Sequence, residues 1–221
     1  MTTSTARKPH QRYYLRSGDR VVGVTTVLDT ISKPALYRWN NSLGLRGIDS
    51  IEHLDYLAGA GTLSHVMIGE QLGGPVADYA GYTPDQVSMA ECALSGFHAW
   101  AEGKSLAAQE LELALTSEVY HYGGTSDALL VVDGRPLLVD FKTSSRIYSD
   151  HCYQVAAYHH LLIETGYTVD GAMVLRLSRD EAGEYSERLI PASGLQPYFA
   201  VFLAALGLYD AIKQATKRGA R

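Results

Sequence analysis

The sequence predicts an α/β fold in which helices flank a mixed central β-sheet. Asp133-Gly134, the strongest short hairpin signal in the chain, joins two apolar runs over 127–132 and 136–142. Segments with apolar residues at helical spacing come before and after this hairpin. A further pair of strand-like segments precedes a last helical segment, and this order of elements is typical of an α/β or α+β domain around a mixed sheet.

The helix that is marked best in the sequence starts after Thr83. This capping hydroxyl is followed by Pro84 at the first helical position and by Gln86, which completes a capping box. Ser50 is expected to cap an earlier helix that ends near Leu72. Further helices are expected over residues 32–45, 149–165 and 195–217.

Alternation of apolar and polar residues predicts the remaining strands. Leu111, Leu113 and Leu115 alternate with polar or small residues, so a half-buried strand is expected there. The other expected strands are a short hairpin over 13–27, turning at 17–19, and a pair over 171–178 and 184–190.

Two glycines interrupt the helix that is expected after Ser50. Gly59 and Gly61 each weaken a helix by up to ~1 kcal/mol relative to alanine. Their presence predicts that another segment approaches this helix closely.

Length and composition indicate an ordinary globular protein. A chain of 221 residues predicts a single domain over 1–221, with an N-terminal extension at 1–45 and a core at 50–217. No apolar stretch reaches the roughly 20 residues of a membrane helix, and the N-terminus lacks the apolar core of a secretion signal. Cys92 and Cys152 form no CxxC, which argues against zinc-finger and iron–sulfur sites and favours a cytoplasmic location.

The charge is unevenly distributed along the chain. A net charge of −5 argues mildly against a nucleic-acid partner, because binding a polyanion requires positive potential. The middle of the chain is acidic, as a site that holds metal cations would be. Solvated charged tails without a partner explain the basic ends equally well. The basic residues at the two ends include Arg7, Lys8, Arg12, Arg16, Arg20, Lys213, Lys217, Arg218 and Arg221.

The hairpin at Asp133-Gly134 places two carboxylates together. With a two-residue turn, Val132 faces Arg135, and counting outward sets Asp127 directly opposite Asp140. Like charges directly opposite each other destabilise a sheet unless a cation lies between them. Two aspartates at the end of an apolar hairpin therefore predict a site for a hard divalent cation, Mg²⁺ or Mn²⁺.

Strand periodicity places Lys142 on the same face as Asp140, while Phe141 points to the opposite face and can anchor the strand in the core. The lysine ammonium can then orient an attacking water or stabilise negative charge on a phosphate. The alternative is a surface hairpin on which Asp140 and Lys142 form a solvated ion pair. An isolated Asp-X-Lys favours that alternative, whereas Asp127 in register favours the metal site.

Four short motifs occur in an order that resembles the PD-(D/E)XK nuclease superfamily. Within it, the chain resembles the RecB-like, phage-type exonucleases, a group that includes mitochondrial-genome-maintenance-type enzymes. The motifs are GTLSH at Gly61–His65, GTSD ending at Asp127, DFK at Asp140–Lys142, and Gln154 with Tyr158. The resemblance implies that the α/β fold has a restriction-endonuclease-like core.

The resemblance also assigns roles to these residues. His65, Asp127 and Asp140 would be metal ligands, together with the main-chain carbonyl of Phe141. Lys142 would be the catalytic lysine. Gln154 and Tyr158 are one helical turn apart, and they would support the lysine or contact DNA.

The activity implied by the resemblance is that of a metal-dependent deoxyribonuclease. It would hydrolyse phosphodiester bonds from DNA ends in recombination, repair or replication, with one or two Mg²⁺ or Mn²⁺ ions. The expected partners are single-stranded DNA or duplex ends, with a recombinase, a single-strand-binding protein or a helicase, and no membrane. No GxxxxGK[ST] motif occurs, so no nucleotide cofactor is expected. A structure-specific or nicking endonuclease and a non-catalytic nucleic-acid-binding module are the alternatives.

A few other residues are candidates for contacts with nucleic acid or metal. Thr143 and Ser144 follow the lysine and could meet a phosphate. Trp39 could stack on a base, although packing is the ordinary role of such a residue, and Arg16 lies in the basic N-terminal segment. Glu110 and Glu118 are candidates for an additional acidic ligand, with a solvent-facing strand position as the alternative for each.

Overall fold

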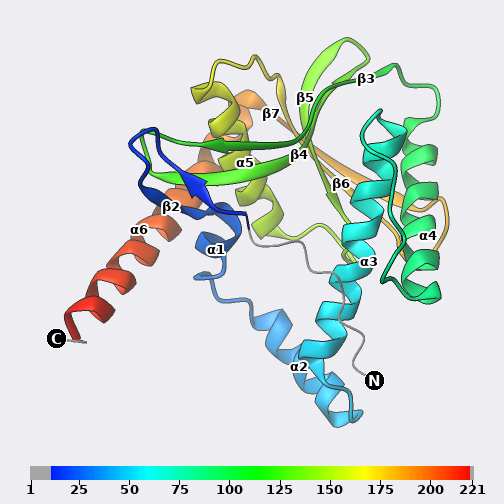
Figure 1. Cartoon of the computed structure of the whole chain (residues 1–221), viewed down its shortest axis with the longest axis horizontal. Helices are drawn as coiled ribbons and strands as arrows, with labels where there is room; N and C mark the ends of the chain where they lie inside the picture. Colours follow the sequence, from blue (N-terminus) through cyan, green and yellow to red (C-terminus); the bar gives the residue numbers. More distant parts are fainter. Residues whose placement is uncertain (1–10, 220–221) are drawn as a thin grey trace.

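The computed structural model describes residues 11–219, so the basic residues Arg7, Lys8 and Arg221 lie outside it. In this part of the chain, helices flank a seven-stranded mixed sheet, which confirms the predicted α/β fold (Figure 1). The strands are β1 (Tyr13–Tyr14), β2 (Arg20–Gly23), β3 (Leu106–Thr116), β4 (Tyr122–Val132), β5 (Arg135–Lys142), β6 (Gly171–Leu177) and β7 (Tyr185–Pro191). The α-helices are α1 (Val24–Leu28), α2 (Pro34–Leu45), α3 (Ser50–Gln71), α4 (Pro84–Ala101), α5 (Ser149–Glu164) and α6 (Gln196–Gly219).

The central strand β4 has different neighbours along its two edges. β3 runs antiparallel along one edge from end to end. On the other edge, β5 pairs antiparallel with residues 128–132, and β2 pairs in parallel with Tyr122 and Gly123. Residues 124–127 therefore have a partner in neither β2 nor β5. The sheet forks at this point, and β5 continues alongside β6 in parallel.

The β4–β5 turn has the geometry that the sequence predicts. Asp133 and Gly134 have φ angles of 50° and 81°, as a two-residue turn of type I′ requires. The register runs from Val132 opposite Arg135 to Ala128 opposite Val139, also as predicted. The strand expected around Leu113 is confirmed as part of β3, and the strand pair near the C-terminus is confirmed as β6 and β7.

Two groups of helices cover the two faces of the sheet (Figure 1). α1, α5 and α6 pack on one face, where Leu129 and Leu138 are buried. α3 and α4 lie side by side on the other face, where Phe97 and Trp100 of α4 pack against Leu130 and other strand residues. Because both faces are covered, the strands β4, β5 and β6 are mostly buried along their length.

The helix starts are mostly where the sequence predicts them. The Thr83 hydroxyl accepts a hydrogen bond from the Gln86 N–H, and the Gln86 side chain completes the capping box at the start of α4. The prediction that Ser50 caps α3 is wrong. Asp49 is the cap, because its carboxylate accepts hydrogen bonds from the N–H groups of Ile51 and Glu52.

The close approach predicted at the glycines of α3 is confirmed. A Cβ atom on Gly59 would lie 2.5 Å from Nε2 of Gln86, which fixes the packing of α4 on α3. A Cβ atom on Gly61 would lie 3.0 Å from Oγ1 of Thr143, directly after β5. Gly61 therefore lets α3 approach the end of β5.

The predicted hairpin over residues 13–27 is only partly correct. β1 and β2 form a short hairpin, but Val24–Leu28 is the helix α1 rather than a continuation of the strand. Three apolar residues of this segment, Val24, Val27 and Leu28, are buried together in the core that α5 and α6 also build. Their spacing of three and four residues suits a helix.

The last helix, α6, begins against the sheet and then extends from the body of the molecule (Figure 1). Phe202, Ala205 and Leu206 are buried, whereas residues 210–217 are exposed. Among the described residues, no helix combines the length and the apolar composition that crossing a membrane requires.

Candidate active site

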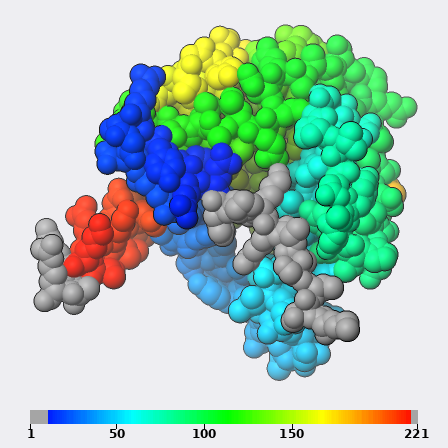
Figure 2. All heavy atoms as spheres, viewed as in Figure 1, coloured from blue at the N-terminus to red at the C-terminus, as the bar shows by residue number. Residues whose placement is uncertain are grey.

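The fork in the sheet brings together side chains from three elements. Asp127 lies on β4, directly beyond the last residue that pairs with β5. Asp140 and Lys142 lie on the part of β5 that continues alongside β6. His65 comes from α3. These four residues are called the central cluster below. Figure 2 shows the surface of β3–β5 between the β1–β2 hairpin and the α3–α4 pair.

The contacts within the central cluster are short and directional. Nζ of Lys142 lies 2.5 Å from Oδ2 of Asp140. Oδ2 of Asp127 accepts a hydrogen bond of 2.8 Å from the N–H of Phe141, and Oδ1 of Asp127 lies 3.5 Å from Nδ1 of His65. Asp140 is 0% exposed, and its Oδ1 has no hydrogen-bond partner among the described residues. A buried carboxylate oxygen without a donor is costly and calls for a cation or a water.

The pKa values of the two aspartates are shifted in opposite directions. Burial raises the pKa of Asp140 to about 6; Lys142 opposes this shift and the nearby Asp127 adds to it. Burial also acts to raise the pKa of Asp127, but His65, Lys142 and the Phe141 N–H outweigh burial and lower it. Asp127 is therefore the more readily ionised of the two carboxylates.

The neighbouring carboxylates raise the pKa values of the two basic groups of the central cluster. Burial acts to lower the pKa of Lys142, but the charges of Asp140 and Asp127 outweigh it, and the pKa is raised. In the same way, burial acts to lower the pKa of His65, and Asp127 outweighs it. At neutral pH Lys142 is consequently a hydrogen-bond donor and not a proton acceptor.

Glu112 is a member of the site that the sequence does not reveal. A ligand atom of Glu112 lies within 4.8 Å of ligand atoms of His65 and Asp127. On β3, Glu112 falls between Leu111, opposite Ala128, and Leu113, opposite Ser126. Glu112 stands between two leucines in the sequence, so its spacing predicts only a solvent-facing strand residue.

Gln154 and Tyr158 form a pair behind the fork. Nε2 of Gln154 donates a hydrogen bond of 2.9 Å to the Tyr158 hydroxyl. The Tyr158 ring is buried against Gly124 of β4, and its pKa is raised well above the ordinary value by burial and by Asp140. Tyr158 is thus packed behind the carboxylates, with 5% of its surface exposed.

Thr143 and Ser144 continue directly from the central cluster. Oγ1 of Thr143 faces Gly61 on α3. The Ser144 hydroxyl donates to the carbonyl of Arg146, while its own carbonyl accepts from Arg176. Among the described residues, the Ser144 side chain has a hydrogen-bond partner, whereas the Thr143 side chain has none.

Four other candidates have contacts of their own elsewhere. The Trp39 ring packs beside His53, 5.8 Å between ring centres, so it serves the α2–α3 contact. Arg16 lies at the β1–β2 turn, and its backbone N–H donates a hydrogen bond to the carboxylate of Glu118. Glu110 accepts a hydrogen bond of 3.1 Å from the Tyr167 hydroxyl. None of these contacts joins the central cluster.

The start of α5 adds a second layer of charge near Lys142. Asp150 in the first turn forms an ion pair of 3.0 Å with Lys33, which directly precedes α2. Nδ1 of His151 accepts a hydrogen bond from the N–H of Tyr148. Burial and the charge of Lys142 lower the pKa of His151 to about 4, so this imidazole is neutral at pH 7.

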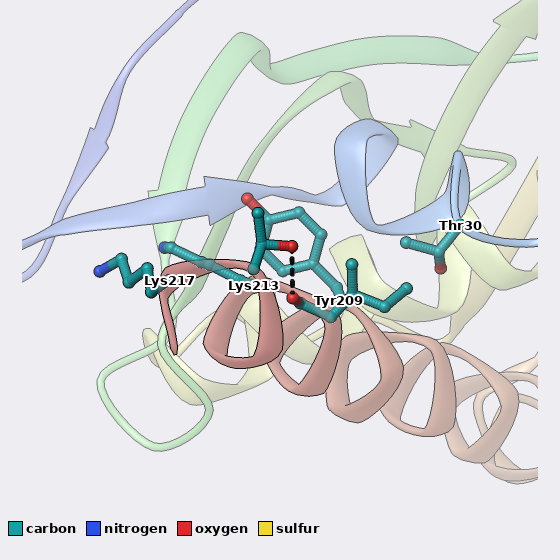
Figure 3. Close-up of a pocket in the computed structure, with 6 residues that line it drawn as sticks. Thr30, Tyr209, Lys213 and Lys217 are labelled. Carbon is teal, nitrogen blue, oxygen red and sulfur yellow. Dashed lines mark hydrogen bonds between the residues drawn. The ribbon is translucent and has the colours of Figure 1, made fainter. Parts of the chain in front are cut away.

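A separate pocket of about 420 Å³ lies along the outer half of α6 (Figure 3). Two lysines, two threonines and two apolar side chains line it, and no carboxylate is among them. It is therefore unsuited to hold a divalent cation and is distinct from the central cluster. Its lining residues are Thr30, Tyr209, Ile212, Lys213, Thr216 and Lys217.

No family model matches the sequence, and no curated protein matches it. Among solved structures, the chain is similar to one described as "Crystal Structure of LHK-Exo in complex with dAMP". The similarity covers 90% of this chain and 94% of that chain, with 13% sequence identity and a TM-score of 0.37. At these values the similarity carries no conclusion about activity. Membership of the PD-(D/E)XK superfamily stays a prediction, and function has to be argued from the site.

Proposed function

We propose that the protein is a metal-dependent nuclease that hydrolyses phosphodiester bonds of DNA, acting from DNA ends. The observation that carries this proposal is the meeting of Asp127, Asp140 and Lys142 at the fork between β4 and β5. Two carboxylates and one ammonium in a largely buried position suit a divalent cation and a phosphate together.

The residues of the central cluster fit a divalent cation. Within residues 11–219 the buried Oδ1 of Asp140 has no donor, and the lowered pKa of Asp127 keeps this carboxylate negatively charged at neutral pH. His65, Asp127 and Asp140 would hold Mg²⁺ or Mn²⁺, with the main-chain carbonyl of Phe141 as a further ligand. Such an ion polarises a phosphoryl oxygen and lowers the pKa of a bound water.

Lys142 acts in this proposal as a donor. Because its pKa is raised, its ammonium keeps its protons at neutral pH and can hold the attacking water or an oxygen of the phosphate. Gln154 and Tyr158 are positioning residues behind this face of the sheet, since Tyr158 is buried against Gly124 of β4. Thr143, which directly follows β5 and whose Oγ1 lies close to Gly61, would contact a phosphate of the substrate.

Cleavage of end-labelled linear DNA is the direct test. Single- and double-stranded substrates are incubated with Mg²⁺, with Mn²⁺ or with chelator, beside a closed circular control. We expect metal-dependent loss of linear DNA and at least a 1000-fold slower rate for Asp140→Ala, since a ligand is removed. Asp170→Ala is the matched control, because this half-exposed aspartate pairs with Arg135 at the opposite end of β5.

The outcomes separate the proposal from its rivals. Cutting of the circle would indicate a structure-specific or nicking endonuclease. DNA binding without cleavage under any metal condition would leave a non-catalytic nucleic-acid-binding module. The expected recombinase, single-strand-binding protein or helicase partner stays a prediction, to be tested by pull-down with purified proteins once the substrate is known.

A further inference from the structure

Three side chains from three different elements converge on the α3 side of Asp127. They are His65 of α3, Glu112 of β3 and Asp127 of β4, and their ligand atoms all lie within 4.8 Å of one another. One imidazole and two carboxylates at such distances are the donors of a divalent-metal site. This group is called the Glu112 cluster below.

The backbone of β3 is bent so that Glu112 takes this position. Glu112 has a φ of 51°, in the left-handed region that a glutamate seldom adopts. The ladder with β4 passes from Leu111 to Leu113 and leaves out Glu112 opposite Asp127. The carboxylate of Glu112 lies beside that of Asp127, and like charges so placed destabilise a sheet unless a cation lies between them.

The Glu112 cluster lies on a different side of Asp127 from the pair Asp140–Lys142. Oδ2 of Asp127 is held by the N–H of Phe141, next to Asp140, whereas Oδ1 points to His65. On the other side, Asp140 is 0% exposed and its Oδ1 has no hydrogen-bond partner among the described residues. Each side of Asp127 thus presents carboxylate oxygen atoms, the donors that a divalent cation prefers.

The donor types of the two sides differ. With His65 assigned to the Glu112 cluster instead, the site at Asp140 keeps only the oxygen donors of Asp140 and Asp127, which suit Mg²⁺, Ca²⁺ or Mn²⁺. The Glu112 cluster adds an imidazole nitrogen, which favours first-row transition ions over Mg²⁺. We propose that the Glu112 cluster is a separate cation site, selective for Mn²⁺ over Mg²⁺, and that Asp127 bridges it to the site at Asp140. The inference deepens the proposed function, on which the bridging role of Asp127 rests.

Direct binding of Mn²⁺ to the whole chain tests the inference without DNA. Calorimetric titration and electron paramagnetic resonance are expected to give two bound Mn²⁺ per wild-type chain and one in Glu112→Gln. Excess Mg²⁺ is expected to displace one of the two ions at least tenfold more readily than the other. Pulsed electron paramagnetic resonance should show ¹⁴N coupling to the Mn²⁺ ion that Mg²⁺ does not displace. His65→Gln should abolish that coupling.

Glu110→Gln is the matched control. Glu110 lies two residues from Glu112 on β3, but its carboxylate accepts a hydrogen bond from the Tyr167 hydroxyl and does not join the Glu112 cluster. It is expected to bind two Mn²⁺ ions like the wild type. Unchanged stoichiometry and unchanged affinity in Glu112→Gln, in a chain folded by circular dichroism, would overturn the inference. The proposed nuclease is tested separately by wild-type cleavage in Mg²⁺: two Mn²⁺ ions in a chain that cuts no DNA would keep the inference and refute the nuclease.

Discussion

At the scale of single residues, the site consists of charges that hold one another in place. Asp127 and Asp140 are close enough to repel, yet the pKa of one is lowered and that of the other is raised to about 6. The difference follows from their partners. Asp127 accepts a backbone hydrogen bond and faces His65, whereas Asp140 is fully buried and forms its ion pair with Lys142. Pairs of carboxylates with such opposite shifts are typical of catalytic centres.

Gly124 allows the supporting tyrosine to lie against β4. A Cβ atom at this position would lie 2.4 Å from Cε1 of Tyr158. We expect Gly124→Ala to lower the free energy of unfolding by about 2 kcal/mol, as overpacking in a filled core does. Urea denaturation followed by circular dichroism measures the change. Gly44→Ala, on exposed α2 with open space around it, should instead stabilise by up to ~1 kcal/mol.

His151 makes stability depend on pH. Folded His151 has a pKa of about 4, whereas the ordinary value is 6.5. Between these values the unfolded chain binds a proton that the folded chain does not, so the free energy of unfolding falls as the pH falls from 6.5 to 4. Because the side chain is partly exposed, we expect a loss of about 1–2 kcal/mol.

Urea denaturation at pH 7 and pH 4.5 measures this contribution as the difference between wild type and His151→Asn. Asparagine can still accept the hydrogen bond from the Tyr148 N–H but does not titrate. The wild type should lose more stability on acidification than the variant. Equal losses in the two proteins would show that His151 is not responsible.

At the scale of elements, the sequence is most informative where structure is local. The turn at Asp133-Gly134 and its register follow from two residues with positive φ. Counting residues outward from the turn therefore predicts that Asp127 lies near Asp140. The caps of α4 are equally local. Glu112 could not be found in this way, because its φ of 51° interrupts the regular strand and its neighbours His65 and Asp127 are distant in sequence.

The short helix α1 is another element that local pattern does not reveal. Four of its five residues, VTTVL, are β-branched and favour a strand by propensity. They form a helix because Val24, Val27 and Leu28 are buried in the core beside α5 and α6. Tertiary packing therefore overrides the local preference, and a sequence pattern of five residues cannot show it.

The ion pair between Lys33 and Asp150 joins the start of α2 to the start of α5. We expect Lys33→Met to speed amide hydrogen exchange in α2 by about two- to fivefold, since a partly exposed ion pair contributes up to ~1 kcal/mol. Hydrogen exchange with mass spectrometry measures it by segment. Arg46→Met, at the other end of α2, is the control and should leave the rates unchanged.

At the scale of the whole molecule, the site depends on strands that are distant in sequence. The fork exists because β2 and β5 share one edge of β4, and only the β5 pairing is a hairpin. The parallel β2–β4 pairing has no local signal in the sequence. The sequence therefore predicts which residues meet at the hairpin but not the opening between β2 and β5.

A cation at this fork would join α3 to the strands β4 and β5 and so stabilise the whole fold. At 100 times the dissociation constant, binding adds about 2.7 kcal/mol to the free energy of unfolding. For a chain of this length we expect saturating Mn²⁺ to raise the Tm by roughly 5–10 °C, reversed by chelator. Differential scanning calorimetry measures the shift, and an equal shift in Asp140→Ala would argue against binding at the central cluster.

The β2–β4 pairing also has a consequence for synthesis of the chain. Val22 pairs with Tyr122, one hundred residues later, and α1 is buried against both α5 and α6, which come still later in the sequence. On the ribosome, the part of the apolar face of α1 that contacts α6 stays uncovered until α6 has emerged, a state in which chains aggregate or bind chaperones. A product that ends before α6 would expose this face permanently, so cellular proteases should remove unfinished copies.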